Sequence, residues 1–544
     1  MMGLLRGTPK PGEPRPELTF PPFTRPSDPP AARRPMPHVP SFPPSRRAVP
    51  VRPALPWPGV RRVALGLLLG SLLTACADGS GTPSPTPPGE EDGLPPVLQP
   101  QTAWTPLFNG QDLGGWSPWL KSRGAGNDPE GVFKVQDGQL RVLDVAPTPG
   151  DREFGYLLTD KRYADYRLRL QYRWDSRTFA PRENEPRDSG VLYHVTGPNK
   201  IWPDSLEFQI LEGGTGDMWL LDGTNFTAKV RDTAARELKY DPLGQTVTTS
   251  ESRGNYRRLI RPDGVQERPD WNTLELVVSG DQATQIVNGQ LAAQATGLRA
   301  PDGSPLSAGR IALQAEGAAI TYRDIELRPL AYLRPPSGAR VLLGEASTAQ
   351  SLGADWQDRR GGDVRWDVQG GVATVRPSGD PQDTNDLRTR ENFGDFRLHL
   401  EFRVPPSRAG LGEQDRGNSG VYLQGRYEVQ ILDSFGAALS GQDDLGAIYG
   451  QHDASSNEAL PSGTWQSYDI DFRAARWSGG QKTENARATV YLNGQKVQDD
   501  VALSGATLLG DAEAEAPGPI VLQDHGSAVS FRNVWVLPTG EAAP

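Results

Sequence analysis

The sequence is poor in cysteine, with one, Cys76, among its 544 residues. A single cysteine excludes an intrachain disulfide and a metal cage built from cysteines alone. Long apolar runs are also missing, since no stretch reaches the roughly 20 residues that a membrane-spanning helix needs. Basic residues are not in excess either: the net charge of −10 argues against a nucleic-acid partner, because neutralising phosphates needs a basic surface.

Cys76 lies at the end of a short apolar segment. Two arginines precede the apolar run 63–73, and two small residues separate that run from the cysteine. A charged start, a short apolar stretch and small residues before the cleavage point are typical of a secretory signal peptide. The ending 73–76 resembles the bacterial lipobox. This resemblance implies lipidation of Cys76, a membrane partner through that lipid, and a location in the cell envelope facing the periplasm or the exterior.

The segments around this signal are expected to carry no folded domain. We predict that residues 1–75 are a leader containing the signal peptide. We hypothesise that 1–59 is a gene-start artefact, because it is rich in proline and arginine and lacks periodicity. Residues 76–100 are rich in proline and glycine, which predicts a partly extended tether.

The rest of the chain consists of two copies of one pattern, which indicates a duplicated domain. Matching segments follow one another in the same order: Tyr163–Arg173 and Phe393–Arg403, Asp188–Val191 and Asn418–Val421, Leu206–Glu212 and Tyr427–Asp433, Ile311–Gln314 and Ile520–Gln523. We therefore predict a first domain over 101–332 and a second over 338–539. The first copy carries an insertion that holds Lys229 to Pro262.

Both copies have the pattern of β-structure. In Phe396–Val404 apolar residues alternate with charged ones, which predicts a strand with one face in a core and one polar face. Short runs of this kind are separated by Asp-Gly, Asn-Gly and Gly-Gly turns. The predicted fold is all-β, with two tandem antiparallel β-sandwiches of jelly-roll type.

The motifs of the second copy point to a known family. They occur in this order: Asn418–Leu423, Gly425–Ser434, Gly446–His452, Gly463–Ile470, Leu522–Gly526 and Phe531–Trp535. This series resembles the 3-keto-disaccharide hydrolase family over about 338–538. The first copy resembles it more loosely over about 101–330.

The resemblance implies a concanavalin A-like jelly roll that acts on glycosides whose sugar is oxidised at C3. A C3 ketone acidifies the C2 proton, so a base can remove it while the C1 substituent leaves. Such a reaction needs a base, an acid for the leaving oxygen, and a group that polarises the ketone, for which a divalent metal is one candidate. The expected partner is a carbohydrate, and the expected activity is cleavage of its glycosidic bond by hydrolysis or elimination.

Within the segment Tyr427–Asp433, strand alternation directs Glu428 and Gln430 to the face opposite the core. A carboxylate and an amide side by side on a sheet can hydrogen-bond sugar hydroxyls, although polar residues on such a face are often only solvated. We interpret Gln430 and Asn418 as substrate-binding residues. Arg403 is a candidate to bind the enolate, with pairing to its neighbour Glu401 as the alternative.

Four side chains of the second copy are candidates for the catalytic base and acid: Glu428, Asp433, His452 and His525. Histidine titrates near neutral pH and is rare in this chain, with five in all, two of which fall inside the family-like motifs. The alternative for His452 is an ordinary place in a polar loop. The alternative for His525 is a cap of the turn at Asp524–Gly526.

The first copy departs from this set. Its substrate-binding candidates are Glu207, Gln209 and Glu212, of which Glu212 stands at the position of Asp433. Glu316 stands at the position of His525, and a carboxylate delivers a proton at neutral pH only if its pKa is raised. The first copy is therefore either a binding module or an enzyme with a different division of labour.

The leading hypothesis is an enzyme that cleaves oxidised glycosides outside the cytoplasm. The alternative is a non-catalytic carbohydrate-binding protein, since jelly rolls serve as lectins as well as enzymes. Exposed tryptophans that stack on sugar faces favour binding, and Trp202 and Trp219 are the candidates, with core packing as their alternative.

Overall fold

The computed structural model describes residues 103–144, 154–249, 258–330, 334–380, 382–408, 410–439 and 441–540. The predicted leader, the predicted lipidation site Cys76 and the predicted tether 76–100 lie outside these residues. Within them, no helix is both long and apolar enough to cross a membrane.

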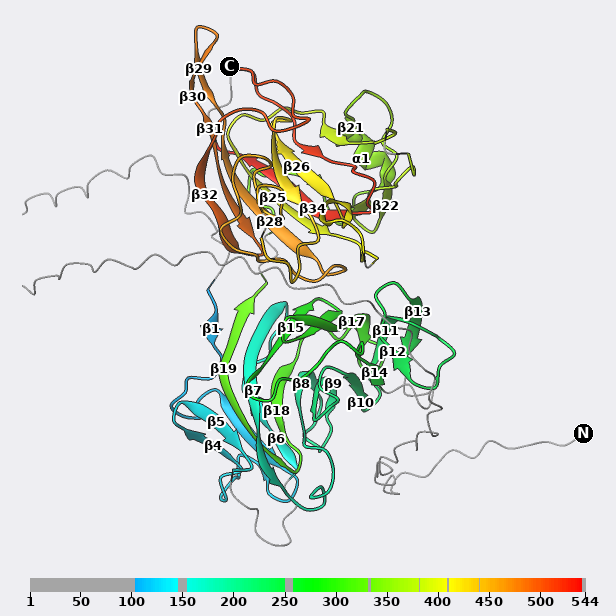
Figure 1. Ribbon diagram of the computed structural model, residues 1–544, viewed down its shortest axis with the longest axis vertical. Helices are drawn as coiled ribbons and strands as arrows, with labels where there is room; N and C mark the ends of the chain where they lie inside the picture. The colour runs from blue at the N-terminus through cyan, green and yellow to red at the C-terminus, as the bar shows by residue number, and fades with distance from the viewer. Residues whose placement is uncertain are drawn as a thin grey trace, which may run out of the picture. The chain divides into compact units, whose positions relative to one another are not determined.

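The first repeat is a sandwich of two large sheets, which are antiparallel apart from the parallel pair β12–β14 (Figure 1). Among the described residues its larger sheet has ten strands: β1 (Thr105–Pro106), β4 (Phe133–Gln136), β5 (Gln139–Val142), β7 (Tyr166–Thr178), β11 (Asn225–Val230), β13 (Gln245–Thr249), β15 (Asn272–Ser279), β16 (Gln282–Val287), β17 (Gln290–Arg299) and β19 (Ala318–Pro329). The smaller sheet, counted in the same way, has nine: β2 (Trp116–Leu120), β3 (Gly124–Ala125), β6 (Gly155–Thr159), β8 (Asp188–Thr196), β9 (Asp204–Leu211), β10 (Met218–Leu221), β12 (Leu238–Lys239), β14 (Arg258–Ile260) and β18 (Arg310–Ala315).

The second repeat has the same plan with fewer strands. In its described part the larger sheet has eight: β20 (Arg340–Leu343), β22 (Asp367–Gln369), β23 (Val372–Thr374), β25 (Phe396–Arg403), β28 (Gln466–Arg473), β31 (Ala486–Leu492), β32 (Gln495–Leu503) and β34 (Ser530–Pro538). The smaller has five in that part: β21 (Trp356–Asp358), β24 (Leu387–Thr389), β26 (Ser419–Leu423), β27 (Tyr427–Ile431) and β33 (Val521–Leu522). A short helix, α1 (Ala349–Asp355), precedes β21, and a hairpin of β29 (Arg476–Ser478) and β30 (Gln481–Glu484) follows β28.

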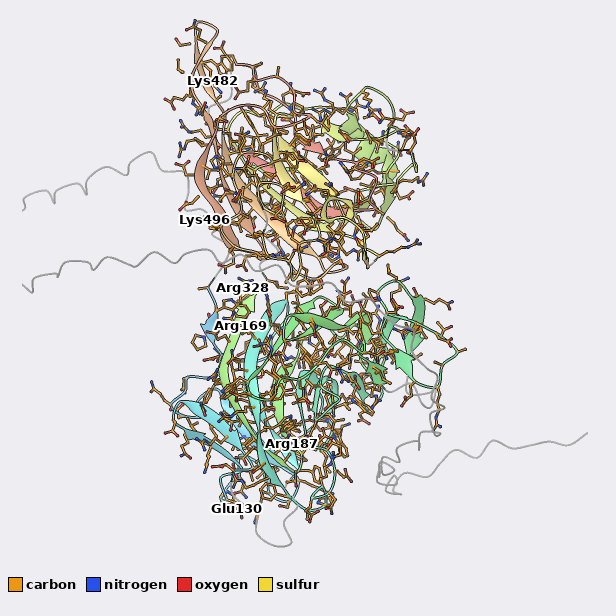
Figure 2. The ribbon with its side chains drawn as sticks, viewed as in Figure 1. Glu130, Arg169, Arg187, Arg328, Lys482 and Lys496 are labelled. Carbon is orange, nitrogen blue, oxygen red and sulfur yellow. The ribbon has the colours of Figure 1, made fainter. Side chains whose placement is uncertain are left out.

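Charged side chains occupy the surfaces of both repeats (Figure 2). Lys482 extends from the β29–β30 hairpin, and Lys496 extends from β32. Because a strand points alternate side chains to opposite faces, each sheet has an inner face toward its core and an outer face that carries most of its polar residues.

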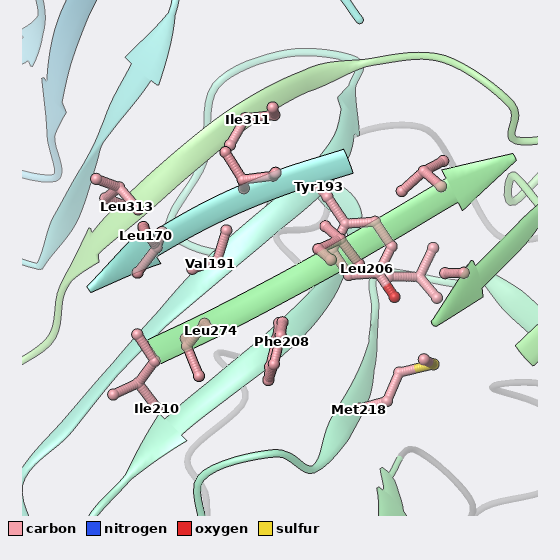
Figure 3. Packing of buried hydrophobic residues seen from close by; sticks show 14 of the residues in the cluster. Leu170, Val191, Tyr193, Leu206, Phe208, Ile210, Met218, Leu274, Ile311 and Leu313 are labelled. Carbon is pink, nitrogen blue, oxygen red and sulfur yellow. The ribbon is translucent and has the colours of Figure 1, made fainter. Parts of the chain in front are cut away.

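Each repeat has its own apolar core between its two sheets. Figure 3 shows part of the first core, where residues from β7, β8, β9, β15 and β18 interdigitate: Leu170, Val191, Tyr193, Leu206, Phe208, Leu274, Ile311 and Leu313. These side chains alternate along their strands with residues on the outer faces. The predictions of an all-β chain and of two tandem jelly-roll sandwiches are confirmed.

The predicted insertion in the first repeat enlarges both of its sheets. It supplies the last two residues of β11 and all of β12, β13 and β14. Strand β13 extends the larger sheet beside β11, while β12 and β14 extend the smaller sheet beside β10. The insertion therefore widens the first sandwich and leaves its core strand order unchanged.

Candidate functional site

The outer face of the five-stranded sheet carries a row of side chains centred on Glu428. Cα pairing aligns Arg388 of β24 with Val521 of β33, Val521 with Tyr422 of β26, and Tyr422 with Glu428 of β27. These positions alternate with core residues on every strand, so the row faces away from the core. The predicted orientation of Glu428 and Gln430 agrees with this register.

A glycine makes room for the Glu428 side chain on the neighbouring strand. A Cβ atom built on Gly420 would lie 2.1 Å from Oε1 of Glu428 and 2.9 Å from its Cδ. No side chain fits at such a distance, so any larger residue at position 420 must displace the carboxyl group. The glycine of the Asn418–Leu423 motif therefore has a role in shaping the site.

Glu428 is held in place by a chain of hydrogen bonds. The Tyr422 hydroxyl donates to its Oε2 at 2.9 Å, and Nε2 of Gln523 donates to the Tyr422 oxygen at 3.2 Å. Glu428 is 4 % exposed. Burial raises its pKa to about 7, with Asp386 adding to the rise and with Tyr422 and Arg359 opposing it. A carboxyl group near half-ionisation at neutral pH can both accept and donate a proton.

Arg359 lies beside this pair. Its guanidinium carbon is 5.2 Å from the centroid of the Tyr422 ring, and its Nη1 is 3.6 Å from Oδ2 of Asp386. Burial works against the charge of Arg359, but the hydrogen bond and charge of Asp511 outweigh it and raise the pKa. The site therefore has a fixed positive charge within reach of its carboxyl group.

Two buried polar atoms on this face have no hydrogen-bond partner among the described residues. They are Oε1 of Gln523 and Nε of Arg388, an acceptor and a donor. Gln523 is 6 % exposed. Because leaving a buried polar group unsatisfied costs about 1–3 kcal/mol, such atoms are expected where a ligand supplies the missing partner.

Gln430 and Asn418 lie on the same outer face, next to Gly420. Nδ2 of Asn418 donates to the Gln414 carbonyl at 2.8 Å, and Nε2 of Gln430 donates to Oε1 of Gln414 at 3.3 Å. Both side chains are almost fully buried. Both side chains are thus fixed beside Glu428 through Gln414, a residue that the sequence alone did not indicate.

Asp433 lies beyond the end of β27 with the opposite parity to Glu428. Its backbone N–H donates to the Arg416 carbonyl, and its surroundings are formed by Arg416, Phe435 and Ser462. Burial raises its pKa. None of the contacts described for Asp433 joins it to Glu428, so the structure does not bring these two candidate carboxylates together.

None of the contacts described for the two candidate histidines joins either of them to Glu428. Nε2 of His452 is 2.9 Å from the Ala502 carbonyl, so this side chain ties its loop to β32. His525 is exposed in the turn after β33. The turn is capped by Asp524, whose Oδ1 accepts from the Gly526 N–H at 3.0 Å.

Arg403 ends β25 on the outer face of the larger sheet, on the opposite side of the core from Glu428. Its guanidinium carbon lies 4.6 Å from the centroid of the Trp465 ring, and that of Arg532 lies 4.2 Å from the same ring. Glu401 pairs with Arg532. Arg403 is thus part of a stack on the other sheet, whereas Arg388 shares the outer face of the five-stranded sheet with Glu428, three strands away.

The first repeat has the same arrangement of a glycine, a glutamate and a glutamine, which we call the frame of the site. Glu207 of β9 pairs with Leu192 of β8, and a Cβ on Gly190 would lie 2.4 Å from its Oε1. Oε1 of Gln314 has no partner in the part of the chain that the structure describes, as at the equivalent Gln523. The glycine, glutamate and glutamine are thus arranged alike in both repeats.

The charges around Glu207 differ from those around Glu428. Arg182 forms ion pairs with both Asp188 and Glu316, and its Nη2 is 3.0 Å from Oε1 of Glu316. Nε2 of Gln209 donates to Asp188 at 2.8 Å. Burial raises the pKa of Glu207 well above its usual range, and Glu316 and Asp188 add to the rise. The ionised form of Glu207 is therefore disfavoured.

Glu212 lies outside this cluster. It is exposed and forms an ion pair with Arg187, whose Nη2 is 2.8 Å from its Oε1. Arg187 is labelled in Figure 2. The hydrogen bond from Arg187 lowers the pKa of Glu212, so this carboxylate is a charged surface group.

An apolar shelf flanks Glu207 where the second repeat has polar groups. Trp119 stacks on Tyr156 with ring centroids 5.2 Å apart, and Trp219 pairs across the strands with Glu207. Trp202 and Trp219 are half-buried and pack on this outer-face cluster, which is separate from the main core. The equivalent row in the second repeat holds Arg388 and Tyr422 instead.

No group of three or more His, Cys, Asp or Glu side chains suited to a metal is present in the described ranges. The groups around Glu428 are a hydroxyl, an amide, arginines and one further carboxylate, Asp386, whose Oδ2 lies 3.6 Å from Nη1 of Arg359, and they do not form the set of oxygen or nitrogen ligands that a divalent cation prefers. The described residues at this site therefore do not fit a metal.

Comparison with known proteins gives matches for both repeats. The model of the 3-keto-alpha-glucoside-1,2-lyase-like domain matches residues 103–328 and 344–537. A search of the curated proteins finds no match to this chain.

Several solved structures are similar to parts of the chain. A candidate glycosyl hydrolase from Parabacteroides distasonis ATCC 8503 is 34% identical, with 38% of this chain and 85% of that chain covered and a TM-score of 0.33. A carbohydrate-binding module from Bacillus subtilis is 10% identical over 39% of this chain and 95% of its own, with a TM-score of 0.22. The β-glucanase of Bacillus licheniformis is 12% identical over 40% and 92%, with a TM-score of 0.24.

Proposed function

Because this chain belongs to the 3-keto-alpha-glucoside-1,2-lyase-like family, of which it holds two copies, we propose that its second repeat cleaves the glycosidic bond of 3-keto-glycosides. The observation that carries the proposal is the buried Glu428, whose pKa of about 7 suits a group that takes and returns one proton.

In the proposed reaction Glu428 is the base. Its carboxylate removes the proton at C2, which the C3 ketone has made acidic, and the C2–H electrons pass into an enolate on the C3 oxygen. The Tyr422 hydroxyl keeps the carboxylate oriented through its 2.9 Å hydrogen bond. Burial raises the pKa of Tyr422 far above its usual range, so this hydroxyl keeps its proton throughout.

The enolate then expels the group at C1. The C1–O bond breaks as a C1–C2 double bond forms, and the protonated Glu428 returns its proton to the leaving oxygen. Addition of water to the double bond completes a net hydrolysis and gives a free 3-keto sugar. One carboxyl group thus serves as base and then as acid, which removes the need for a second carboxylate at the position of Asp433.

The unpartnered atoms of the site supply the remaining interactions. The Arg388 guanidinium is the group that stabilises negative charge on the C3 oxygen, because its Nε is buried without a partner among the described residues. Oε1 of Gln523 accepts a hydrogen bond from a sugar hydroxyl. Both interactions satisfy polar atoms that are otherwise left unpaired.

The first repeat is proposed to bind carbohydrate without turning it over. Burial, together with Glu316 and Asp188, raises the pKa of its Glu207 well above the usual range and so disfavours the ionised form that a base needs. Leu158 replaces Arg388 in the row across the sheet, so the cation proposed to stabilise the enolate is absent from that row. The shelf of Trp119, Trp202 and Trp219 offers aromatic surface to a sugar ring.

The location of the protein is also a proposal. The lipobox-like sequence at Cys76 supports an envelope lipoprotein whose repeats are held away from the membrane by the proline-rich segment 76–100. Globomycin-sensitive processing and labelling by a fatty-acid probe test this, and Cys76→Ser is expected to lose the label.

A matched pair of variants tests the proposed activity. The assay is release of the aglycone from a 4-nitrophenyl 3-keto-glucoside by the full chain. Glu428→Gln is expected to lower kcat by about 10³-fold, within the usual range for loss of an acid–base group, because an amide cannot take the C2 proton. Glu207→Gln is expected to leave kcat within about twofold, since the first repeat does not catalyse.

Two outcomes would contradict this assignment. Equal losses in both variants would mean that both repeats catalyse or that neither does. Failure of the unaltered chain to release any aglycone, with retained binding of the substrate in calorimetry, would favour a carbohydrate-binding protein. The apolar shelf of the first repeat is the observation that favours this second candidate.

A further inference from the structure

The loop that follows β32 lies directly against Glu428. The Thr507 hydroxyl oxygen accepts from the Glu428 backbone N–H at 3.0 Å and lies 3.1 Å from the Arg426 carbonyl, while the Thr507 N–H donates to that same carbonyl at 2.9 Å. The Asp511 N–H donates to the Gly425 carbonyl at 2.8 Å. This loop is therefore bonded to β27 and to the turn that precedes it.

The side chains that surround Glu428 also hold the tip of the loop. Nη2 of Arg359 donates to the Leu509 carbonyl at 2.8 Å, and the Tyr422 hydroxyl is 3.3 Å from the Leu508 carbonyl. The backbone carbonyls of Leu508 and Leu509 thus lie against Tyr422 and Arg359, the side chains beside Glu428.

The base of the loop has its own anchor. Nζ of Lys482, the lysine labelled on the β29–β30 hairpin in Figure 2, donates to the Ser504 carbonyl at 3.0 Å and to Oε2 of Glu513 at 2.6 Å. The Tyr427 hydroxyl donates to Oε1 of Glu513 at 2.7 Å. The loop is thus fixed at both ends and at its tip.

The side chains at this tip are apolar and open to solvent. Leu508 is 65% exposed and Leu509 68%, the largest values for large hydrophobic residues among those the structure describes. Leu509 has a φ of +62°, a conformation that favours glycine or asparagine over leucine. A loop that served only as a connection would be expected to carry a polar residue at each position.

The first repeat has no equivalent of this tip. Its connection from β17 to β18 is residues 300–309, whereas the connection from β32 to β33 is the longer 504–520. The shorter connection has the sequence Ala-Pro-Asp-Gly-Ser-Pro-Leu-Ser-Ala-Gly, whose leucine, Leu306, is buried. The exposed leucine pair is therefore confined to the repeat that carries the proposed catalytic glutamate.

We propose that Leu508 and Leu509 form an apolar rim that contacts the aglycone, and that the substrates are 3-keto-glycosides with an aryl or alkyl aglycone. The polar groups beneath the rim serve the oxidised sugar, whose hydroxyls need donors and acceptors. The leucine side chains pack against the aglycone, the part of the ligand that has few hydroxyl groups. This proposal rests on the proposed function of the same site.

A double variant of the rim tests the proposal. Leu508→Ser with Leu509→Asn removes the apolar side chains, and asparagine tolerates the positive φ at 509, so the loop is expected to keep its conformation. For a phenyl or octyl 3-keto-glucoside we expect kcat/KM to fall by about tenfold through KM, and for the methyl 3-keto-glucoside to stay within about twofold. Leu243→Ser, at an exposed leucine of the first repeat, is the control and should change neither value.

Binding measurements separate failure of the rim from failure of the proposed activity. In calorimetry with phenyl and methyl glucosides, the unaltered chain should favour the phenyl compound and the double variant should lose that preference, whether or not turnover occurs. Equal affinity of the unaltered chain for both compounds, or an unchanged preference in the double variant, would overturn the rim. Vesicle binding that is lost in the double variant, without any preference among glycosides, would assign the leucines to a membrane surface and would also overturn it.

Discussion

At the scale of single residues, the site depends on how one carboxyl group is solvated. Glu428 is buried beside Arg359 and Asp386, whose charges act on it in opposite directions. Burial therefore decides its pKa, and the value of about 7 is near the pH at which a group can work as both base and acid. At Glu207, burial and two acidic neighbours together raise the pKa well above the usual range.

The hydrogen bond from Tyr422 is predicted to set the pH dependence of turnover. Glu428 must be ionised to act as base, so kcat/KM is expected to rise with pH through about 7. Tyr422→Phe removes a hydrogen bond that stabilises the carboxylate, which raises the pKa further and moves the rising limb to higher pH. A pH–rate profile checks this. An unchanged limb in Tyr422→Phe would show that the titrating base is another group.

At the scale of strands, the site requires a gap in the side chains of β26. Gly420 leaves that gap, and β24, β33, β26 and β27 then bring Arg388, Gln523, Tyr422 and Glu428 onto one face. Strands β26 and β27 form a hairpin, whereas β24 and β33 lie far from that hairpin in sequence.

Filling the gap is predicted to disable the site without unfolding the sheet. In Gly420→Ala the new Cβ would meet the Glu428 carboxyl, and displacing it by about 1 Å is expected to lower kcat by about 10²-fold. Gly394→Ala is the matched control, since a Cβ there meets nothing within 4 Å. Circular dichroism confirms folding of both variants. Unimpaired turnover by Gly420→Ala would contradict the proposed place of the carboxyl group.

A second buried cluster ties three strands of the larger sheet. His399 of β25 lies 2.7 Å from Asp469 of β28 and 3.8 Å from Glu401, and its Nε2 lies 3.2 Å from Asn533 of β34. Burial disfavours its charged form, but the two carboxylates outweigh burial and raise the pKa of His399 to about 9. The imidazolium is therefore a fixed positive charge between strands at neutral pH.

This cluster predicts how stability depends on pH. The pKa of His399 is above its unfolded value of about 6.5, so its contribution to the free energy of unfolding is fully present below pH 6.5 and is lost as pH rises through 9. The loss is expected to be on the order of 3 kcal/mol. Urea titrations of the full chain between pH 6 and 10 measure it. His399→Gln should remove most of this dependence, and an equal slope in that variant would assign it to other groups.

The sequence was sufficient for the fold and for part of the site. Two-residue periodicity and the repeated motifs predicted both sandwiches, and alternation along 427–433 predicted the face of Glu428. It did not identify Arg388 or Tyr422, because their place on the same face as Glu428 depends on the order of strands in the sheet. It grouped Asp433 with Glu428 through nearness in sequence, although Asp433 lies two residues beyond the end of β27.

At the scale of the whole molecule, the two repeats share one frame and differ in what lines it. Both repeats keep a glycine, a glutamate and a glutamine. The side-chain oxygen of each glutamine has no hydrogen-bond partner among the described residues. Around that frame the first repeat has an aromatic shelf and two further carboxylates, while the second has arginines, a tyrosine and the leucine rim. We infer that duplication was followed by a division into binding and catalysis.

The fate of the C2 hydrogen tests the central claim most directly. The full chain is incubated with a 3-keto-glucoside in D₂O, and the sugar product is examined by NMR and mass spectrometry. Elimination by Glu428 followed by addition of water predicts one deuterium at C2 of the released 3-keto sugar. Substrate incubated with Glu428→Gln should carry no deuterium at C2. The sugar released by Glu207→Gln should be labelled as fully as that from the unaltered chain. Release of the aglycone with hydrogen retained at C2, after correction for exchange of the free sugar, would contradict the account.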